Sequence, residues 1–478
     1  MSSNISIKKA ALLIAVSKYA SVVFNILFTM ILARLLTPED YGIVAVTVVF
    51  TNFFTILADM GLSNGIIQDK GLTKQDNDGI FLFSVFLGLL LGLVFFCCSF
   101  GIASFYDNKA YIPIGTLLGI SLFFSTANVV PNALILKHKD FKLIAQRNVA
   151  IPLISSLITV GLAWIGLSYY SLVFQSLLNS LFTFLLNYVT AYKRYTLRLV
   201  FRNDFNGIHR IFNYSLYQFL FNVINYFSRN LDNLLVGKFF GAIALGYYDK
   251  AYKLMVYPTG MLTHVITPAL QPILSDYQND KDFIYEKYIR ILKFLSLIGV
   301  FIVAYCYIAA SEIILILFGS QWIQAIPYFA WLSLSVWAQM ILGTTGSIYS
   351  SAGDTKRLFI TGCISTLITI TAIICGVLSG NLKDLARNVS LAYMFQFWVV
   401  MFILIKFTLK QPFLKFLKNF LPDLTIGIVL FCIGNLFYII SISNVFLLAL
   451  IKLIIIGVVF LAMCKLLGQL HYIIFIHH

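Results

Sequence analysis

Long apolar runs separated by short polar segments constrain the fold of this chain more than any other feature. Each run extends over roughly 20 residues, the length at which an α-helix crosses the hydrocarbon core of a bilayer. Of the 478 residues, 60% are hydrophobic and 11% are charged, with a mean hydropathy of +0.90. Soluble domains carry about 25% charged residues. The composition therefore excludes a water-soluble fold and predicts an all-α integral membrane protein.

About fourteen runs are long enough to form transmembrane helices. The first six extend over about residues 10–34, 39–62, 79–104, 112–135, 149–168 and 171–192. The other eight extend over about residues 211–237, 247–271, 288–310, 325–349, 358–378, 389–408, 423–441 and 444–466. We therefore expect an N-terminal six-helix lobe (1–192), a basic cytoplasmic linker (193–210), a second six-helix lobe (211–410), and a final helix pair with a cytoplasmic tail (411–478).

Lysine and arginine concentrate in alternate loops between the predicted helices. Of the 34 such residues, 24 lie on one side, and the other side holds only Arg34, Lys109, Lys238, Lys383 and Arg387. Cytoplasmic loops are enriched in these residues, so both termini are predicted to be cytoplasmic. The net charge of +15 is dispersed among these short loops, which argues against a nucleic acid partner.

The predicted external turn at Arg34 has a weak counterpart at Lys238, 204 positions later. In each turn the cation is followed by two large apolar residues and, eight positions after the cation, by a glycine, Gly42 or Gly246. Both turns lie between the first two helices of their half. The similarity predicts a parallel repeat, an architecture in which transporters bind substrate between the halves, unless it arises by chance in apolar sequence.

Two turns carry signals for the start of a helix. In the first, Thr37 is a suitable N-cap, Pro38 suits the first helical position, and Asp40 favours the positive end of the helix dipole. In the second, Gly353 is expected to end one helix and Asp354 to cap the next. These signals predict local structure and say nothing of a substrate.

Taken together, these turns resemble the polysaccharide flippase family, the bacterial exporters of undecaprenyl-linked repeat units for O-antigen and capsule. Residues 32–42 read Leu-Ala-Arg-Leu-Leu-Thr-Pro-Glu-Asp-Tyr-Gly, and residues 353–356 read Gly-Asp-Thr-Lys. Residues 231–237 and 245–254 also resemble family segments. The resemblance extends from about residue 5 to residue 410, and the final two helices are similar only in hydropathy.

This family belongs to one superfamily with lipid II flippases and with multidrug and toxin extrusion antiporters. The resemblance therefore implies two lobes around a central cavity that opens to each side of the membrane in turn. It also implies a lipid-linked oligosaccharide as cargo, with membrane lipids and a polysaccharide polymerase as further partners.

Charges within the spans are the best candidates for a binding site, since each costs at least about 2.5 kcal/mol at the bilayer centre unless it faces protein or water. The cations expected to line the cavity are Lys18, Arg34, Arg229, Lys250 and Lys253. The candidates for ion coupling are Asp232 and Asp59. Cations suit this cargo because they neutralise a lipid pyrophosphate in a region of low dielectric constant.

Structural alternatives exist for several of these residues. Arg229 and Asp232 are three positions apart, which permits an internal ion pair. Lys250 and Lys253 lie near a helix end, from which their ammonium groups can reach the membrane surface. Asp59 and Lys452 are expected at the membrane interface.

No cofactor, metal site or catalytic residue is expected. The seven cysteines lie in apolar runs without CxxC spacing and are interpreted as small core residues. Only His264 of the six histidines falls within a span, without an obvious partner. No loop exceeds about twenty residues, too few for an external catalytic domain.

The sequence therefore predicts a flippase for undecaprenyl-pyrophosphate-linked repeat units in the bacterial cytoplasmic membrane, serving capsule, O-antigen or exopolysaccharide synthesis. A multidrug or cation antiporter of the same superfamily is the first alternative, although it favours acidic cavity residues. A membrane polymerase or ligase is a weaker one.

Overall fold

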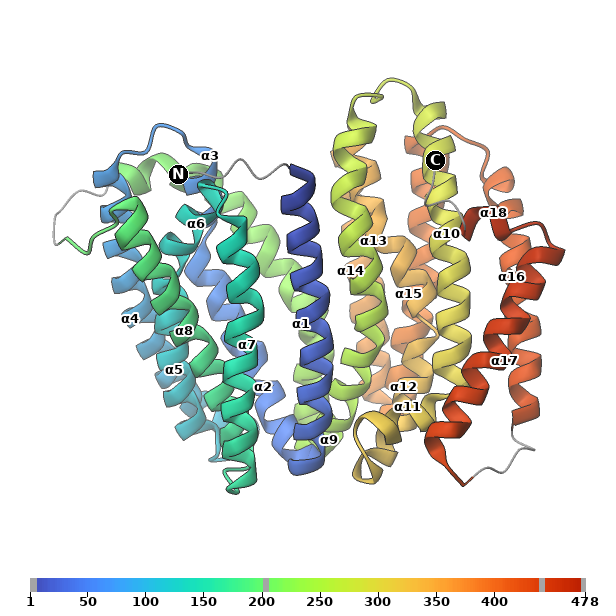
Figure 1. The fold of residues 1–478 in the computed structure, drawn as a ribbon, viewed down its shortest axis with the longest axis horizontal. Helices are drawn as coiled ribbons and strands as arrows, with labels where there is room; N and C mark the ends of the chain where they lie inside the picture. Colours follow the sequence, from blue (N-terminus) through green and yellow to red (C-terminus); the bar gives the residue numbers. More distant parts are fainter. Residues whose placement is uncertain (1–6, 201–205, 438–442, 474–478) are drawn as a thin grey trace. The chain divides into compact units, whose positions relative to one another are not determined.

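The computed structural model describes residues 7–200, 206–437 and 443–473, and every regular element in these ranges is helical (Figure 1). Backbone contacts divide the chain into two compact units, Met1–Gly246 and Tyr247–His478. The boundary falls within α9 (Asn206–Ser275), a run of helix whose backbone departs from helical geometry at Gly241, with φ 85° and ψ 173°. Glycine adopts such an angle without the steric cost that a side chain brings.

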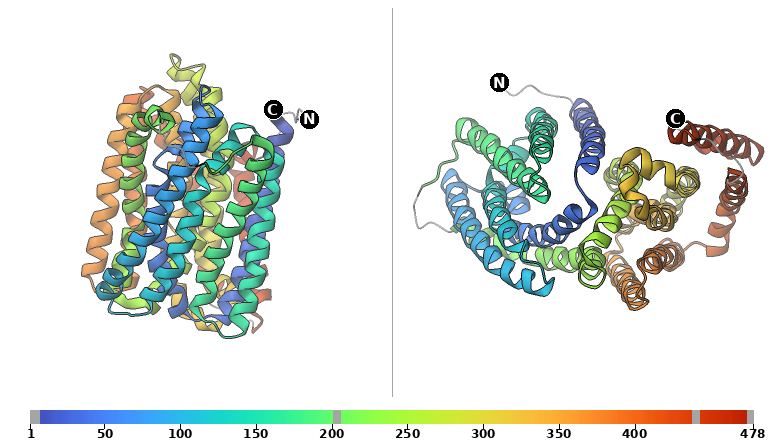
Figure 2. Two further views of the ribbon diagram at one scale, coloured as in Figure 1. Left: turned by 90° about the vertical axis from the view of Figure 1, so that its left-hand side faces the viewer. Right: turned by 90° about the horizontal axis from the view of Figure 1, so that it is seen from below.

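The first unit contains α1 to α8 and the first part of α9. The bounds are α1 (Ile7–Leu35), α2 (Pro38–Asp59), α3 (Leu62–Gln68), α4 (Lys74–Phe105), α5 (Tyr111–Ala127), α6 (Val129–Lys137), α7 (Phe141–Trp164) and α8 (Tyr169–Tyr195). Within this unit α4 packs on α5, α1 packs on α7, and α8 packs on both α5 and α7 (Figure 2).

The start of α2 confirms the predicted capping. Thr37 is the N-cap, with a side chain that accepts a hydrogen bond from the backbone N–H of Asp40, and the Asp40 carboxylate accepts one in return from the N–H of Thr37. Thr73 and Asp76 form the same capping box at the start of α4. Asp40 also accepts hydrogen bonds from Ser168 and from the N–H of Tyr169, which ties the first turn of α2 to the start of α8.

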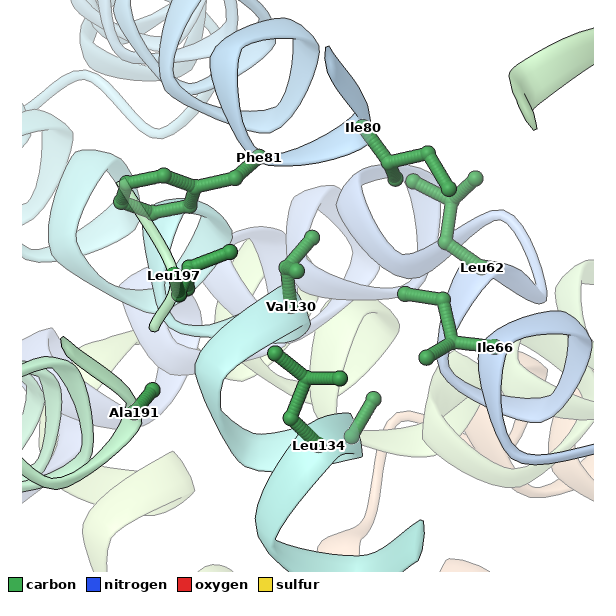
Figure 3. Close-up of a cluster of buried hydrophobic side chains, with 9 residues drawn as sticks. Leu62, Ile66, Ile80, Phe81, Val130, Leu134, Ala191 and Leu197 are labelled. Carbon is green, nitrogen blue, oxygen red and sulfur yellow. The ribbon is translucent and has the colours of Figure 1, made fainter. Parts of the chain in front are cut away.

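A cluster of apolar side chains holds the short helices of the first unit in place (Figure 3). It joins Leu62 and Ile66 of α3, Phe81 of α4, and Val130 and Leu134 of α6. Ile66 and Val130 are completely shielded from solvent. Helices of seven to nine residues are unstable alone, so this packing is what stabilises α3 and α6.

The glycines of the two similar turns are in close contact within the first unit. A Cβ atom built on Gly42 would lie 1.8 Å from the carbonyl oxygen of Ala242, and one on Gly246 would lie 1.9 Å from that of Pro38. Real Cβ atoms do not approach other atoms so closely, so only glycine fits at either position.

The second unit contains the rest of α9 and the helices that follow. The bounds are α10 (Lys281–Ile308), α11 (Ala310–Leu317), the 3₁₀ helix η1 (Ser320–Ala325), α12 (Ile326–Ser333), α13 (Val336–Ser351), α14 (Thr355–Leu378), α15 (Leu382–Ile403), the π-helical η2 (Leu404–Thr408), α16 (Phe413–Leu436), α17 (Val445–Leu466) and α18 (Leu470–Ile473). As predicted, Asp354 caps α14 and Gly353 has a positive φ of 70°.

Helix α10 is the scaffold of the second unit, in contact with α12, α13, α16 and α17 (Figures 1 and 2). Its apolar face places Leu297 and Ala304 against Ile426 and Leu430 of α16 and Ile456 of α17, all of them fully buried. The final helix pair, which the sequence relates to the known family only by hydropathy, is therefore firmly packed on α10.

Each of the fourteen predicted spans overlaps a helix, although the sequence misses some breaks. The span predicted at 112–135 is divided into α5 and α6, and the one at 325–349 is divided into α12 and α13, which meet at 52°. In the described part of the chain, ten helices are long and apolar enough to cross a membrane, or eleven with that bent pair counted as one. The number fourteen stays a prediction.

The interpretation of the cysteines as core residues is wrong for most of them. Cys97, Cys98, Cys363, Cys375 and Cys432 are exposed at the protein surface, and only Cys464 is buried. An apolar sequence does not distinguish a core face from a lipid face, because both exclude water.

Candidate functional site

The clearest grouping of predicted site residues lies in the second unit, in the part of α9 that follows Gly246. The Lys250 side chain is buried, with 4% of the residue exposed. Its Nζ lies 5.4 Å from the ring centroid of Phe318 and 5.8 Å from that of Trp322. At these distances the negative face of an aromatic ring attracts a cation. The ring of Tyr247 makes an edge contact with Trp322 at a centroid distance of 5.9 Å.

Lys253 lies one turn after Lys250 in a different environment. It is exposed, and its Nζ is 2.7 Å from a carboxylate oxygen of Asp249, a residue that is itself buried. The prediction of Lys253 as a cavity cation overlooked this partner, although the spacing of four residues on a helix favours such a pair. Nearby, the hydroxyls of Tyr252 and Tyr393 are 3.4 Å apart.

The first unit holds the other predicted residues, and the structure does not gather them at one place. Arg34 is exposed at the end of α1, where its Nη1 donates to the carbonyl of Met30 at 3.0 Å. Asp59 lies at the opposite end of α2. Arg229 is exposed on α9, whereas Asp232 is buried and accepts a hydrogen bond from the N–H of Asn233 at 2.8 Å. The side chain of Lys18, on α1, lies outside the described residues.

Asp59 has a structural task in the break between α2 and α3. Its carboxylate accepts hydrogen bonds from the backbone N–H of Ser63 at 3.3 Å and from the Ser63 hydroxyl at 2.5 Å. Between them, Met60 and Gly61 both have positive φ angles. The carboxylate thereby satisfies donors at the start of α3 that would otherwise lack a partner.

Two buried ion pairs in the second unit were missed by the sequence. Lys293 of α10 pairs with Asp423 of α16, and their side chains are 3% and 2% exposed. The sequence counts Lys293 among the cytoplasmic loop cations, but it lies inside α10. Lys452, which the sequence places at the membrane interface, is buried in α17 and pairs with Glu312 of α11 at 2.7 Å. A buried lysine needs such a partner to offset the loss of hydration.

Further hydrogen bonds satisfy these pairs. The Ser296 hydroxyl donates to Asp423 at 2.5 Å, and the indole N–H of Trp337 donates to the Ser296 oxygen at 2.9 Å. Lys293 also donates to the carbonyl of Asn419, and Lys452 donates to that of Ile308. The two ion pairs join α16 to α10 and α17 to α11. Because their charges are already neutralised, these four side chains have little capacity to bind a cargo.

The second-unit grouping has the chemistry of an anion and sugar site. Lys250 supplies positive charge away from water, and the half-buried Tyr247 is a side chain of the kind that stacks on sugar faces, whereas Trp322 is fully buried. Among the described residues, no three histidine, cysteine or acidic side chains gather where they could hold a metal ion.

The fold is that of a known class of membrane transporters. The lipid II flippase MurJ in an inward closed conformation superposes with a TM-score of 0.77 at 14% sequence identity, covering 96% of this chain and 99% of that one. An inward-facing multidrug resistance MATE family transporter of the MOP superfamily gives a TM-score of 0.63 at 15% identity, covering 80% and 93%. The chain therefore has the fold that these transporters share, and its many apolar helices are those of a multi-pass membrane protein.

The family described as polysaccharide biosynthesis proteins matches residues 31–327. A membrane protein from the cps region of Klebsiella pneumoniae is 26% identical over 335 residues, which are 70% of this chain and 69% of that protein. The teichuronic acid biosynthesis protein TuaB of Bacillus subtilis is 22% identical over 389 residues, 80% and 79% of the two chains. This chain belongs to the polysaccharide biosynthesis protein family, which confirms the resemblance seen in its turns.

Proposed function

We propose that this protein is a flippase that moves undecaprenyl-pyrophosphate-linked oligosaccharide repeat units from the cytoplasmic to the outer leaflet by alternating access. The observation that carries the proposal is the combination of family and fold: a polysaccharide biosynthesis protein with the fold of a lipid II flippase. Export of repeat units for capsule, O-antigen or exopolysaccharide is the step of such a biosynthesis that needs a transporter.

The charges of the second unit favour an anionic cargo. Lys250 is buried against aromatic rings, an environment in which a phosphate can shed its water and gain a charge-assisted hydrogen bond. Aromatic side chains beside that lysine suit the sugar that follows the phosphate.

A multidrug or cation antiporter is the alternative, because one of the proteins that shares the fold is a multidrug transporter. Such a protein needs acidic side chains that can bind a cation. Here the buried carboxylates Asp423 and Glu312 are paired with lysines, and Asp249 is paired with Lys253. This pairing favours the flippase. Asp232, which is buried, and Asp59, which accepts from Ser63, stay the two candidates for ion coupling.

The proposal includes a location and a topology. The protein would lie in the bacterial cytoplasmic membrane with both termini in the cytoplasm, since 24 of its 34 lysines and arginines fall on that side of the predicted spans. Two six-helix lobes would surround the cavity, with Lys18 and Arg34 contributed by the first and Arg229 and Lys250 by the second. A polysaccharide polymerase would take the cargo on the outer side.

Deletion of the gene, with analysis of surface polymer and of lipid-linked intermediates, tests the proposal. Loss of polymer, together with repeat units that accumulate in the inner leaflet and are inaccessible to an externally added glycosidase, is the expected result. Restoration by a plasmid copy is the control for polar effects. Normal polymer with altered tolerance to cationic drugs would instead support the antiporter.

A further inference from the structure

Arg147 differs from the other arginines in its surroundings. It lies in α7, six residues after the helix begins, and is partly buried. Its Nη1 donates to Oδ1 of Asn187 on α8 at 2.8 Å. By contrast, Arg194, Arg290, Arg357 and Arg387 each pair with a carboxylate. In the described part of the chain, no carboxylate lies within ion-pair distance of Arg147, so its positive charge is not neutralised.

Buried amides fix the direction of this arginine. Asn187 is completely shielded, and its Nδ2 donates to Oδ1 of Asn128 at 2.7 Å, which leaves its own Oδ1 to face Arg147. An amide positions a guanidinium without cancelling its charge. The guanidinium has five N–H donors in a planar fork, and one is used by Asn187. That fork matches two oxygens of a phosphate.

Helix α8 continues this polar face along the membrane. Gln175 and Asn179 are about one turn apart, and Asn187 follows Asn179 by eight positions, so the three carboxamides lie within an arc of about 120° around the helix. Gln175 donates to the hydroxyl of Ser156 on α7 at 2.9 Å. The Oδ1 of Asn179 is buried and, among the described residues, has no hydrogen-bond donor. Such an acceptor suits the hydroxyl group of a sugar.

Helix α1 approaches the same part of α7. The hydroxyl of Ser21 donates to the backbone carbonyl of Asn148, the residue after Arg147, at 2.8 Å. Lys18 precedes Ser21 by one helical turn, so the backbone of a cation predicted from the sequence lies near Arg147.

We propose that Arg147, oriented by Asn187, binds a phosphate of the lipid-linked cargo, and that the carboxamide of Asn179 binds a hydroxyl of the attached sugar. Asn179 precedes Asn187 by eight residues, or about 12 Å along the helix, so the two contacts fall on successive parts of one extended head group. The identity of the cargo rests on the proposed function. The site itself is built only from residues of the first unit.

Binding to the purified protein in detergent tests the phosphate site directly. The probe is undecaprenyl pyrophosphate, with undecaprenol, which has no phosphate, as the matched lipid. We expect Arg147→Ala to weaken binding of the pyrophosphate at least tenfold, with binding of undecaprenol unchanged, and Arg147→Lys to have a smaller effect. Arg194→Ala, which removes an exposed and paired arginine, should bind as the wild type does. Equal affinity of Arg147→Ala and the wild type would overturn the proposal.

Asn187→Asp distinguishes cargo binding from a structural role. A carboxylate at this position would pair with Arg147 and neutralise it, so we expect weaker pyrophosphate binding and at least tenfold less exported polymer. Asn128→Ala is the matched control, since it removes the same hydrogen bond between Asn187 and Asn128 but leaves Arg147 charged. If Arg147 had only a structural role, Asn187→Asp would bind and export as the wild type does. That result would contradict the proposal. If the wild-type gene fails to restore polymer but Arg147→Ala still weakens pyrophosphate binding, the proposed function falls and the phosphate site stands.

Discussion

Gly42 and Gly246 lie at equivalent positions of the two similar turns, and each contacts the backbone of the other turn. Gly42 faces the carbonyl of Ala242, and Gly246 faces that of Pro38. Pro38 precedes Gly42 by four residues, and Ala242 precedes Gly246 by four residues. The two contacts therefore join equivalent pairs of residues, each pair with one member in each turn. Such reciprocity is produced by an approximate two-fold relation. The weak repeat in the sequence thus coincides with a specific contact.

A side chain at either glycine should prevent this contact. Gly42→Ala or Gly246→Ala would place a Cβ atom less than 2 Å from a backbone oxygen, which cannot rotate away. We expect each variant to reach the membrane in folded form at no more than about a tenth of the wild-type amount, measured by fluorescence-detected size exclusion of a fusion protein. Gly161→Ala is the control, since no atom lies within 4 Å of its position. Wild-type amounts of Gly42→Ala would refute this interpretation.

Removing one partner of the ion pair between Lys293 and Asp423 should destabilise the protein much more than replacing both partners with apolar side chains. Removing one partner strands a buried charge, which costs about 3 to 5 kcal/mol. We expect Lys293→Met and Asp423→Leu each to lower the thermal stability in detergent strongly, and the double variant to recover a large part of the loss. Arg290→Met, which breaks an exposed pair with Glu286, is the control. Additive losses in the double variant would contradict a coupled pair.

The buried charge of Lys250 should matter for transport, unlike that of an exposed cation such as Arg290. Lys250→Met keeps most of the side-chain volume but removes the charge beside Phe318 and Trp322. We expect export of polymer to fall at least tenfold at an unchanged membrane level, because the cargo loses a buried cation. Arg290→Met removes a cation that pairs with the exposed carboxylate of Glu286 and should change export less than twofold. Full export by Lys250→Met would remove this lysine from the site.

The turn capped by Asp354 should make stability depend on pH. Burial opposes ionisation of this carboxyl, but hydrogen bonds from Thr408 and Arg357 outweigh it and hold its pKa below the usual value of 3.8. The unfolded chain therefore binds the proton more tightly, so the stabilisation is complete above that value and is lost as the pH falls through the folded-state pKa.

The variant Asp354→Ala isolates this contribution. At pH 7 it should be less stable than the wild type by about 1 kcal/mol from the lost N-cap alone. The difference in melting temperature should shrink below about pH 4, near the usual pKa of an aspartate. A difference that is constant down to pH 3 would show that the charge of Asp354 is not involved.

The sequence predicts best what depends on neighbouring residues. The caps at Thr37 and Asp354 follow from signals within four positions, and the helices follow from apolar runs. Contacts between distant residues leave no such signal, so the partner of Lys293 on α16 was not found. Nor does an apolar run tell which of its faces meets lipid, and Cys97 was misplaced for that reason. Arg147 falls just before the span predicted at 149–168, although the structure places it six residues inside α7.

The two buried ion pairs also bear on how the protein is made. Lys293 is synthesised 130 residues before Asp423, and Glu312 is synthesised 140 residues before Lys452. At about 5 to 20 residues per second, each charge waits roughly 7 to 28 seconds for its partner. A chain interrupted before α16 carries a lysine in α10 and a glutamate in α11 that have not yet met these partners. A charge within the bilayer without its partner costs free energy, so the interrupted chain is less stable than the complete one.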